Sequence, residues 1–387
     1  MLISKLKLKN WRNFKKVEAN LRERVFILGP NAAGKSNLLD ALRFIRDVAK
    51  PEGGGLQKSV KDRGGVTKLR CLAARKDTEI LIEVELTRSP AEPPCWRYTL
   101  GFRGEGKGQN RVFVSQETVV DLHKNQVLIN RPDVNDDRDQ ERRTQTALEQ
   151  ISANKEFREI SDFFGSITYL HLVPQLLKYA DQLGGYKLEH DPFGQAFLER
   201  VASNNEKTRN ARLKKIEMAL RACVPNMREL RFIKDETTGA PHLEALYEHW
   251  RPGAGLQRED QFSDGTLRLL GIMWSLLEGD SLLLLEEPEL SLNEEIVKQI
   301  PALLWKVQKS SRHRRQVFLT THSQSLLSDM SIDPREVLLL KPSDNGTEVT
   351  QIAEKDQELV KAGYSIADIV LPKIRPNNLE QLVLFNP

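Results

Sequence analysis

VFILGPNAAGKSN, residues 25–37, decides the fold of this chain, because it joins an apolar strand to a helix through a glycine-rich loop. The match to the pattern G-x-x-x-x-G-K-S is complete and consists of Gly29, Pro30, Asn31, Ala32, Ala33, Gly34, Lys35 and Ser36. Glycines let backbone N–H groups curl around phosphate oxygens, and the N-terminus of the following helix adds a favourable dipole. We therefore expect residues 29–36 and Asn37 to bind the phosphates of ATP, with Lys35 on the β- and γ-phosphates and the Ser36 hydroxyl on Mg²⁺.

A second motif, LLLLEEPE at residues 282–289, places two adjacent carboxylates at the end of a strand. Four consecutive leucines are typical of a buried strand, whose C-terminal tip would carry Glu286 and Glu287. Such a pair can place Glu286 beside Mg²⁺ and Glu287 beside an attacking water, as a general base. The competing interpretation is an acidic helix N-terminus, which the helix dipole also favours. The complete phosphate loop earlier in the chain makes that interpretation the weaker one.

The composition is that of a globular protein. The 387 residues include 58 Lys and Arg and 54 Asp and Glu, a net charge of +4, and 39% of them are hydrophobic. This mix excludes disordered and fibrous classes, and the mild positive charge is compatible with nucleic acid without arguing for it. The apolar runs fall far short of the roughly 18 residues of a membrane span. Three separated cysteines and the lack of an apolar signal region predict a cytoplasmic protein with no membrane partner.

The hydrophobic patterns predict an α/β fold whose main sheet is built from both ends of the chain. Strands are expected near the N-terminus at 3–11, 16–21 and 25–28, and an antiparallel meander over 69–120. After Ser263, helices and strands alternate through the strand at 316–320. Between these regions we expect a surface loop at 51–67, a solvated loop leading into a helix at 130–160, a strand at 167–173 and one long helix at 193–221.

With these motifs the chain resembles the ABC-class ATPases of the RecF/SMC/OLD type, among the AAA family ATPases. Four further stretches carry the resemblance, in the order typical of the family. They are FSDGTLR (262–268) at the signature loop, LSLN (290–293) at the D-loop, FLTTHS (318–323) at the H-loop and VPQ (173–175) at the Q-loop. Together with the first two motifs they cover about the first 50 residues and residues 165–330.

The resemblance implies a P-loop NTPase fold, an ABC-type head with an antiparallel β subdomain and an inserted helical or mixed lobe. We expect residues 1–125 and 225–345 to form the ATPase head and residues 126–224 the inserted lobe. Residues 346–387 are expected to form a C-terminal tail. The length leaves room for such a head and lobe but not for a long SMC coiled coil.

The resemblance also implies that ATP binding joins two copies head to tail. The signature of one subunit would face the γ-phosphate held by the P-loop of its partner, through Ser263, Asp264, Gly265 and Thr266. A helix N-terminus aimed at a phosphate is physically sensible for the reasons given for the P-loop. His322 would contact the γ-phosphate or the transition state, and Gln175 would bind and sense Mg²⁺ and the attacking water.

Three departures from the family pattern bear on the rate of ATP hydrolysis. Glu286 stands where many ABC ATPases have Asp, a change that resembles the Glu-Glu-Pro-Glu version of OLD-like proteins. Asp264 replaces a signature glycine and brings a negative charge near a phosphate, and Asn293 replaces the D-loop Asp. Hydrolysis is therefore expected to be slow or to depend on a partner.

The resemblance leaves several function classes open. In the first, the chain is a DNA-associated ATPase switch of the OLD/RecF-like type that works in bacterial anti-phage defence. The tail after His322, about 65 residues, is too short for a Toprim nuclease and lacks its carboxylate pattern, so a separately encoded Toprim-like nuclease is the expected partner. The second class is RecF-like DNA repair. A transporter ATPase fits worse, because its insert is compact and helical, and a non-hydrolysing scaffold is the remaining alternative.

Two basic stretches are the candidates for DNA contact. One is the helix around residues 207–215, and the other consists of Lys309, Arg312, His313, Arg314 and Arg315. Both can equally be ordinary solvated surfaces. Aromatic residues are not interleaved with either stretch, which disfavours stacking on single strands.

Overall fold

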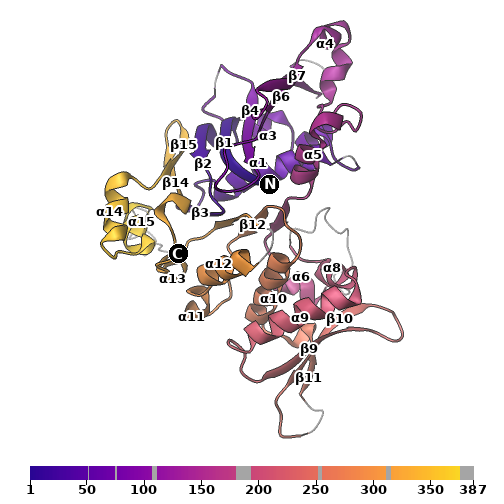
Figure 1. Cartoon of the computed structure of the whole chain (residues 1–387), viewed down its shortest axis with the longest axis vertical. Coiled ribbons are helices and arrows are strands. Elements are labelled where there is room, and N and C mark those ends of the chain that lie inside the picture. Colours follow the sequence, from indigo (N-terminus) through magenta and orange to yellow (C-terminus); the bar gives the residue numbers. More distant parts are fainter. Residues whose placement is uncertain are drawn as a thin grey trace, which may run out of the picture.

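The computed structural model describes residues 1–50, 52–74, 76–106, 111–179, 193–251, 255–310 and 315–374. Within these residues the chain forms two six-stranded sheets and one three-stranded sheet. In Figure 1 the antiparallel six-stranded sheet lies toward one end of the molecule and the three-stranded sheet toward the other, with the mainly parallel sheet between them. This layout confirms the predicted α/β head with an antiparallel subdomain.

The antiparallel sheet has the strand order β2-β1-β4-β5-β6-β7. Its strands are β1 (Leu2–Trp11), β2 (Phe14–Asn20), β4 (Ile80–Thr87), β5 (Trp96–Gly104), β6 (Val112–Asp121) and β7 (Gln126–Arg131). Along β1, Leu6 and Leu8 are buried while the lysines between them are partly exposed. Because side chains alternate across a strand, Lys5, Lys7 and Lys9 lie together on the outer face of this sheet.

The mainly parallel sheet has the order β15-β14-β3-β13-β12-β8, and only the β14–β15 pair is antiparallel. Its strands are β3 (Arg24–Leu28), β8 (Thr168–Leu170), β12 (Leu283–Glu286), β13 (Val317–Thr320), β14 (Val337–Ser343) and β15 (Gly346–Gln351). Since parallel strands run in one direction, the carboxyl ends of β3, β13, β12 and β8 meet at one edge of the sheet. The P-loop, Glu286, Glu287 and the H-loop all follow these ends.

Helices connect the strands of the three sheets. They are α1 (Lys35–Ala49), α2 (Leu56–Asp62), α3 (Val66–Leu69), α4 (Val134–Arg138), α5 (Arg158–Gly165), α6 (Pro174–Lys178), α8 (Phe197–Ala202), α9 (Glu206–Leu220), α10 (Asp264–Leu277), α11 (Glu294–Val297), α12 (Ile300–Ser310), α13 (Gln324–Leu327), α14 (Glu354–Lys361) and α15 (Ile366–Ile374). Short 3-10 helices occupy Gln140–Thr144, Lys155–Phe157, Glu259–Gln261 and Pro334–Glu336. Among the helices in the described ranges, none has both the length and the apolar character needed to cross a bilayer.

Two hydrophobic cores cover the two faces of the parallel sheet. On one face, Ile27 and Leu284 pack with α1 and with the antiparallel sheet. On the other face, Phe26 and Leu285 pack with α10 and α12. Because both faces are buried, the central strands consist of continuous apolar runs, which is why the sequence marks them clearly.

A separate lobe is built on the three-stranded sheet, which has the order β11-β10-β9. Its strands are β9 (Met227–Lys234), β10 (Pro241–Tyr247) and β11 (Leu256–Arg258). Helix α9 contacts β9, helix α8 contacts β10, and Leu213 and Leu243 belong to the core that also covers α10. The lobe is thereby joined through apolar contacts to the helix that carries the signature residues.

Several sequence expectations are corrected by the structure. The stretch 51–67, expected to be a loop, carries α2 and the beginning of α3, which use Gly55 and Gly65 as N-caps. The single long helix expected at 193–221 is two helices, α8 and α9, and the Asn205 side chain caps the second by accepting from the Thr208 N–H. The strand expected at 167–173 ends after Leu170, and α6 begins at Pro174.

The elements also cross the domain boundaries expected from the sequence. Strand β7, beyond residue 125, pairs with β6 in the antiparallel sheet, and α5 packs on α1. The three-stranded sheet, expected within the head from residue 225, packs on α8 and α9. Strand β15, expected in the tail, pairs with β14 in the parallel sheet. Backbone pairing therefore places β7 and β15 in the two six-stranded sheets, while β9, β10 and β11 form a sheet of their own that packs with α8 and α9.

Candidate functional site

The P-loop runs from the fully buried strand β3 into α1, as the sequence predicts. Two of its residues adopt left-handed backbone conformations, Ala32 with φ of 61° and Gly34 with φ of 95°. Helix α1 has no acidic residue in its first turn and no side chain that caps its N-terminus. Its first N–H groups therefore remain available for an anion, which the helix dipole favours.

Lys35 points back along this loop. Its Nζ donates to the carbonyl oxygens of Gly29 at 3.2 Å and Pro30 at 3.3 Å, and it also contacts Nε2 of His322. Burial lowers the pKa of the Lys35 ammonium, while the nearby carboxylates of Glu287 and Glu286 oppose this shift. A buried ammonium with only neutral acceptors in direct contact favours an anionic ligand.

Ser36 and Glu286, the two residues expected at Mg²⁺, are brought together. The exposed Ser36 hydroxyl donates to Oε1 of Glu286, and the Tyr169 hydroxyl donates to Oε2 of the same carboxylate. Burial and the charge of Glu286 raise the pKa of Tyr169, so its hydroxyl stays protonated and can donate. A hydroxyl and a carboxylate are the hard oxygen donors that suit Mg²⁺.

Glu287 stands next to this pair, with an unusual backbone conformation. Its φ is 44°, a region that costs a non-glycine residue about 1–3 kcal/mol. The conformation is held by its N–H, which donates to the Thr320 carbonyl at 3.1 Å and lies 3.2 Å from the Thr320 hydroxyl. It brings Oε1 of Glu287 to 3.7 Å from Nε2 of His322.

His322, the predicted H-loop residue, follows β13 and faces Lys35 and Glu287. Burial, and then the charge of Lys35, lower the pKa of its imidazole, so the ring is mainly neutral at pH 7. Its backbone N–H donates to Oε1 of Glu289 at 3.2 Å, and the Thr321 hydroxyl donates to the same oxygen at 2.6 Å. Glu289 therefore fixes the H-loop, and burial raises the pKa of its carboxyl group.

The signature residues form the beginning of α10. Ser263 is the N-cap of this helix and accepts a hydrogen bond from the Thr266 N–H at 3.1 Å. Gly265 lies beside the D-loop, because a Cβ placed on it would be 3.0 Å from the Ser291 carbonyl oxygen. In the described part of the chain, no hydrogen bond or ion pair joins residues 263–266 to the P-loop of the same copy.

Gln175 is placed differently from the expectation. Its Nε2 donates to Oδ2 of Asp264 at 2.6 Å, and Lys178 Nζ lies 2.7 Å from Oδ1 of the same carboxylate. None of the described hydrogen bonds of Gln175 reaches Ser36 or Glu286. The pairing arises because α6 lies against the start of α10, so the negative charge of Asp264 is met by Lys178 within the same copy.

Sequence reasoning missed three residues that shape the site. They are Tyr169, His171 and Asn13. Nδ1 of His171 lies 3.2 Å from the Glu286 carbonyl oxygen. The Asn13 amide donates to the Ala33 carbonyl at 2.8 Å and to the Thr347 hydroxyl at 2.7 Å, and its oxygen accepts from Asn37 at 2.9 Å. Tyr169 and His171 alternate along and just after β8, and that spacing was the available signal.

Several side chains of the two basic stretches proposed for DNA are engaged within the protein, while Lys207 and Lys215 on α9 are exposed. On α9, the Arg209 guanidinium lies over Phe232 and Arg212 donates to Asn204 at 2.7 Å. Arg315 is buried and donates to the Ser281 carbonyl at 2.7 Å, and burial lowers its pKa to about 10. Lys309 lies over the Trp305 ring, and residues 312–314 fall outside the described part of the chain.

The chain has relatives among known families and curated proteins. A family model described as "AAA domain, putative AbiEii toxin, Type IV TA system" matches residues 24–328. The DNA replication and repair protein RecF of Roseiflexus castenholzii is 32% identical over 100 residues. This match covers 24% of the present chain and 25% of that RecF, so it spans about a quarter of the relative's length.

Solved structures match almost the whole chain in fold. An Smc head bound to the C-terminal winged-helix domain of ScpA has a TM-score of 0.55 at 15% identity, covering 92% of this chain and 100% of that one. An Smc head with an extended coiled coil, from Pyrococcus furiosus and bound to the C-terminal domain of ScpA, has a TM-score of 0.51 at 14% identity, covering 93% and 98%. The chain therefore has the ABC-type head fold, and it belongs to the AAA-domain family of the putative AbiEii toxin type, among the P-loop ATPases of the RecF/SMC class.

Proposed function

We propose that this protein binds ATP with Mg²⁺ and hydrolyses it to ADP and phosphate. The observation that supports the proposal best is the meeting of Ser36 and Glu286 beside Lys35, Glu287 and His322 at one edge of the parallel sheet. These side chains come from separate segments of the chain. Their convergence provides phosphate-binding, metal-binding and proton-accepting groups within one site.

Each residue has a chemical task in this proposal. Lys35 and the N-terminus of α1 neutralise the phosphate oxygens, which requires Lys35 to leave its contact with His322. Ser36 and Glu286 would hold Mg²⁺, and the metal would neutralise charge on the phosphates. Water attacks the γ-phosphorus, its proton passes to the Glu287 carboxylate, and the bond to the ADP oxygen breaks.

The catalytic unit in this proposal is a head-to-tail dimer that assembles on ATP. Ser263, Gly265 and Thr266 of one copy would contact the γ-phosphate in the other copy, and His322 would approach the same phosphate from within its own copy. The position of Ser263 at the N-terminus of α10 supports this role. Gln175 would reach Mg²⁺ only after its bond to Asp264 has broken, which supports slow hydrolysis.

Replacing Glu287 with Gln tests the hydrolytic role. The amide cannot accept the proton from water, so turnover should fall by at least about 100-fold, the usual range for loss of a general base. ATP binding should persist, and a stable ATP-bound dimer should accumulate. Phosphate release and sedimentation in the presence of ATP measure these two effects.

Glu354→Gln provides the matched control, since Glu354 is exposed on α14, in the C-terminal segment of the described chain. It should leave turnover and oligomeric state unchanged. Turnover at the wild-type rate in the Glu287→Gln variant would remove Glu287 as the base. Failure of wild-type protein to release any phosphate, with DNA present or absent, would contradict the hydrolytic function itself.

For the biological setting, we propose a nucleotide-driven switch that associates with DNA. We propose that it acts in bacterial defence against phage, together with a separately encoded Toprim-like nuclease. The family description names a putative toxin of a type IV toxin–antitoxin system. The RecF relative supports the alternative, DNA repair or recombination. Purification of the complex from its native host distinguishes them, because a stoichiometric nuclease favours defence and recombination proteins favour repair.

A further inference from the structure

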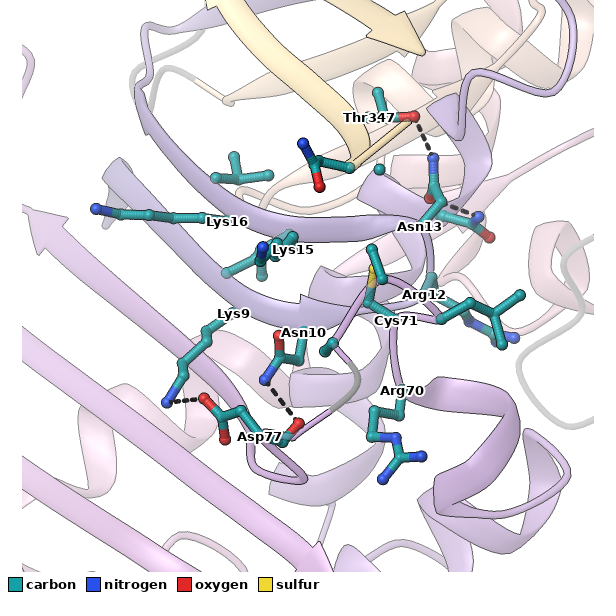
Figure 2. A pocket seen from close by; sticks show the side chains of 18 of the residues that line it. Lys9, Asn10, Arg12, Asn13, Lys15, Lys16, Arg70, Cys71, Asp77 and Thr347 are labelled. Carbon is teal, nitrogen blue, oxygen red and sulfur yellow. Dashed lines mark hydrogen bonds and ion pairs between the residues drawn. The ribbon is translucent and has the colours of Figure 1, made fainter. Parts of the chain in front are cut away.

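A basic hollow lies on the outer side of the antiparallel sheet, next to the P-loop. The strands β1 and β2, residues 67–74, 76 and 77, and the β14–β15 turn enclose a volume of about 1800 Å³. Figure 2 shows side chains from these segments around it, with Asn13 joined to Thr347 at one side and Lys9 joined to Asp77 at another. Ala32 and Asn37 also line it, so the hollow borders the candidate nucleotide site.

Its charge is strongly unbalanced. Of the described residues that line it, eight are Lys or Arg and two, Asp77 and Asp344, are acidic. Three of the basic side chains are neutralised inside the protein, such as Lys9 by Asp77 at 2.8 Å and Glu79 at 3.0 Å. The other five have no ion-pair partner in the described part of the chain, namely Lys15, Lys16, Lys68, Arg70 and Lys76.

The strand register adds a further sign of an anionic ligand. Lys9 of β1 and Lys16 of β2 are directly opposite each other in the antiparallel pair, and both belong to the outer face. Like charges at such a position destabilise a sheet. By contrast, the neighbouring pair on that face, Lys7 and Glu18, has opposite charges. Because Asp77 and Glu79 neutralise Lys9, the positive charge of this pair that lacks an ion-pair partner in the described residues is that of Lys16.

The chemistry of the lining favours nucleic acid over a small ligand or a protein. The volume exceeds the roughly 300–1,000 Å³ typical of small-molecule sites. Lysine, which supplies four of the five unpaired cations, is depleted in protein–protein interfaces but is a regular contact for DNA phosphates. None of the described lining residues is aromatic, so the hollow lacks the stacking platforms of single-strand sites.

Leu72 provides an independent feature of the same surface. It is 93% exposed, in the segment that also carries Arg70 and Lys76. An apolar side chain held out between cations matches the wedges that proteins insert at base steps of the DNA minor groove. On these grounds, and resting on the proposed DNA-associated ATPase, we propose that the hollow binds the phosphate backbone of duplex DNA while Leu72 contacts the minor groove.

The position of the hollow links DNA to the nucleotide. Asn13 forms part of its wall and also bonds to the Ala33 carbonyl and to Asn37 in the P-loop. Bound DNA therefore contacts the residues that hold the P-loop in shape. Duplex binding should consequently change the affinity for ATP, and ATP should change the affinity for duplex by the same factor.

The test compares two double charge reversals in the full chain. Lys15→Glu with Lys16→Glu alters the hollow, and Lys207→Glu with Lys215→Glu makes the same charge change on the exposed side of α9. Fluorescence anisotropy with a labelled duplex at several salt concentrations measures DNA affinity. Titration with a fluorescent ATP analogue shows whether each variant keeps its nucleotide site.

The hollow variant should bind duplex at least about tenfold more weakly. Its salt slope should be smaller by about 0.9 for each phosphate that the variant no longer neutralises. The α9 variant should bind as the wild type does, and both should retain ATP. Leu72→Ala should weaken duplex binding without changing the salt slope. Wild-type affinity in the hollow variant, or a weakening confined to the α9 variant, would overturn the proposed location.

Two further outcomes separate this inference from the proposed function. If polyglutamate displaces the duplex as effectively, charge for charge, as unlabelled duplex does, the hollow fits an acidic protein and the duplex proposal fails. If wild-type protein hydrolyses ATP but binds no duplex even at low salt, the hollow proposal fails while the ATPase stands. If wild-type protein binds duplex through the hollow but does not hydrolyse ATP, the hollow proposal stands and the ATPase proposal fails.

Discussion

At the scale of single residues, the site depends on a few backbone conformations that most side chains cannot adopt. Gly34 combines a φ of 95° with very close packing, because a Cβ placed on it would be 2.2 Å from Nδ2 of Asn13. The same Asn13 supports Ala33 and Asn37 by hydrogen bonds. Two separate features therefore require glycine at position 34. The first is its positive φ, and the second is the close packing of Asn13, which supports the whole loop.

Gly34→Ala separates these two reasons when it is compared with Gly363→Ala. Gly363 has a similar φ of 99°, but nothing lies within 4 Å of a Cβ placed there. Both changes should cost about 1–2 kcal/mol of folding stability from backbone strain alone. Only Gly34→Ala must also displace Asn13, so it alone should abolish ATP binding. Thermal unfolding and nucleotide titration measure the two effects, and equal ATP affinities in the two variants would contradict this reasoning.

At the scale of elements, α6 and α10 are joined by polar contacts to Asp264. Its carboxylate, about one-third exposed, accepts from Gln175 and pairs with Lys178. In a head-to-tail dimer the same carboxylate would face a phosphate. In the proposed dimer the bonds to α6 would screen a charge that would otherwise oppose ATP, and they keep Gln175 away from Ser36 and Glu286, the proposed Mg²⁺ ligands.

Asp264→Ala should release α6. Partly exposed ion pairs contribute little, below about 1 kcal/mol, so amide hydrogen exchange in residues 174–178 should speed up only a few-fold. ATP-induced dimerisation should become stronger, because a negative charge near the partner's phosphate has been removed. Asp280→Ala, an exposed change beyond the other end of α10, should have neither effect. Unchanged exchange in α6 would show that Asp264 does not hold it.

The sequence predicts the elements whose patterns are local. The P-loop strand and helix, the leucine strand before Glu286 and the strand before His322 all lie where expected, because burial on both faces gives continuous apolar runs. The partners of Asn13 and Gln175 could not be predicted in this way. Asn13 and Thr347 are 334 positions apart, and Gln175 and Asp264 are 89 apart, so only tertiary packing brings them together.

At the scale of the whole molecule, one copy contains the P-loop and the signature without a described polar contact between them. The proposed dimer would place each P-loop opposite the signature of the other copy. A defect in the P-loop and a defect in the signature would then affect different halves of each composite site. Two inactive variants can therefore complement each other when they are mixed.

Lys35→Ala should lose nucleotide binding, and Ser263→Arg should keep it but block dimerisation and hydrolysis. In a mixed dimer, one site combines the intact Lys35 of one copy with the intact Ser263 of the other. An equal mixture should regain up to roughly half of wild-type turnover, since neither variant forms a dimer with itself and each mixed dimer has one intact site of two. Phosphate release from the mixture measures this recovery.

The matched control for this experiment mixes Lys35→Ala with Glu287→Gln. Both residues belong to the same half of a composite site, so every site in this mixture keeps one defect and turnover should not recover. A mixture of Lys35→Ala and Ser263→Arg that stays as inactive as its components would exclude composite sites.

The bond between Asn13 and Thr347 has a consequence for the timing of biosynthesis. The P-loop is made within the first 36 residues, yet its supporting hydrogen bond needs a residue that is made more than 300 positions later. At about 5–20 residues per second, translation takes roughly 15 to 60 seconds to cover that distance. Throughout that interval Asn13, which supports the loop through Ala33 and Asn37, lacks its own bond to Thr347. The bond that links Asn13 to Thr347 can therefore form only after the chain has been made beyond residue 347.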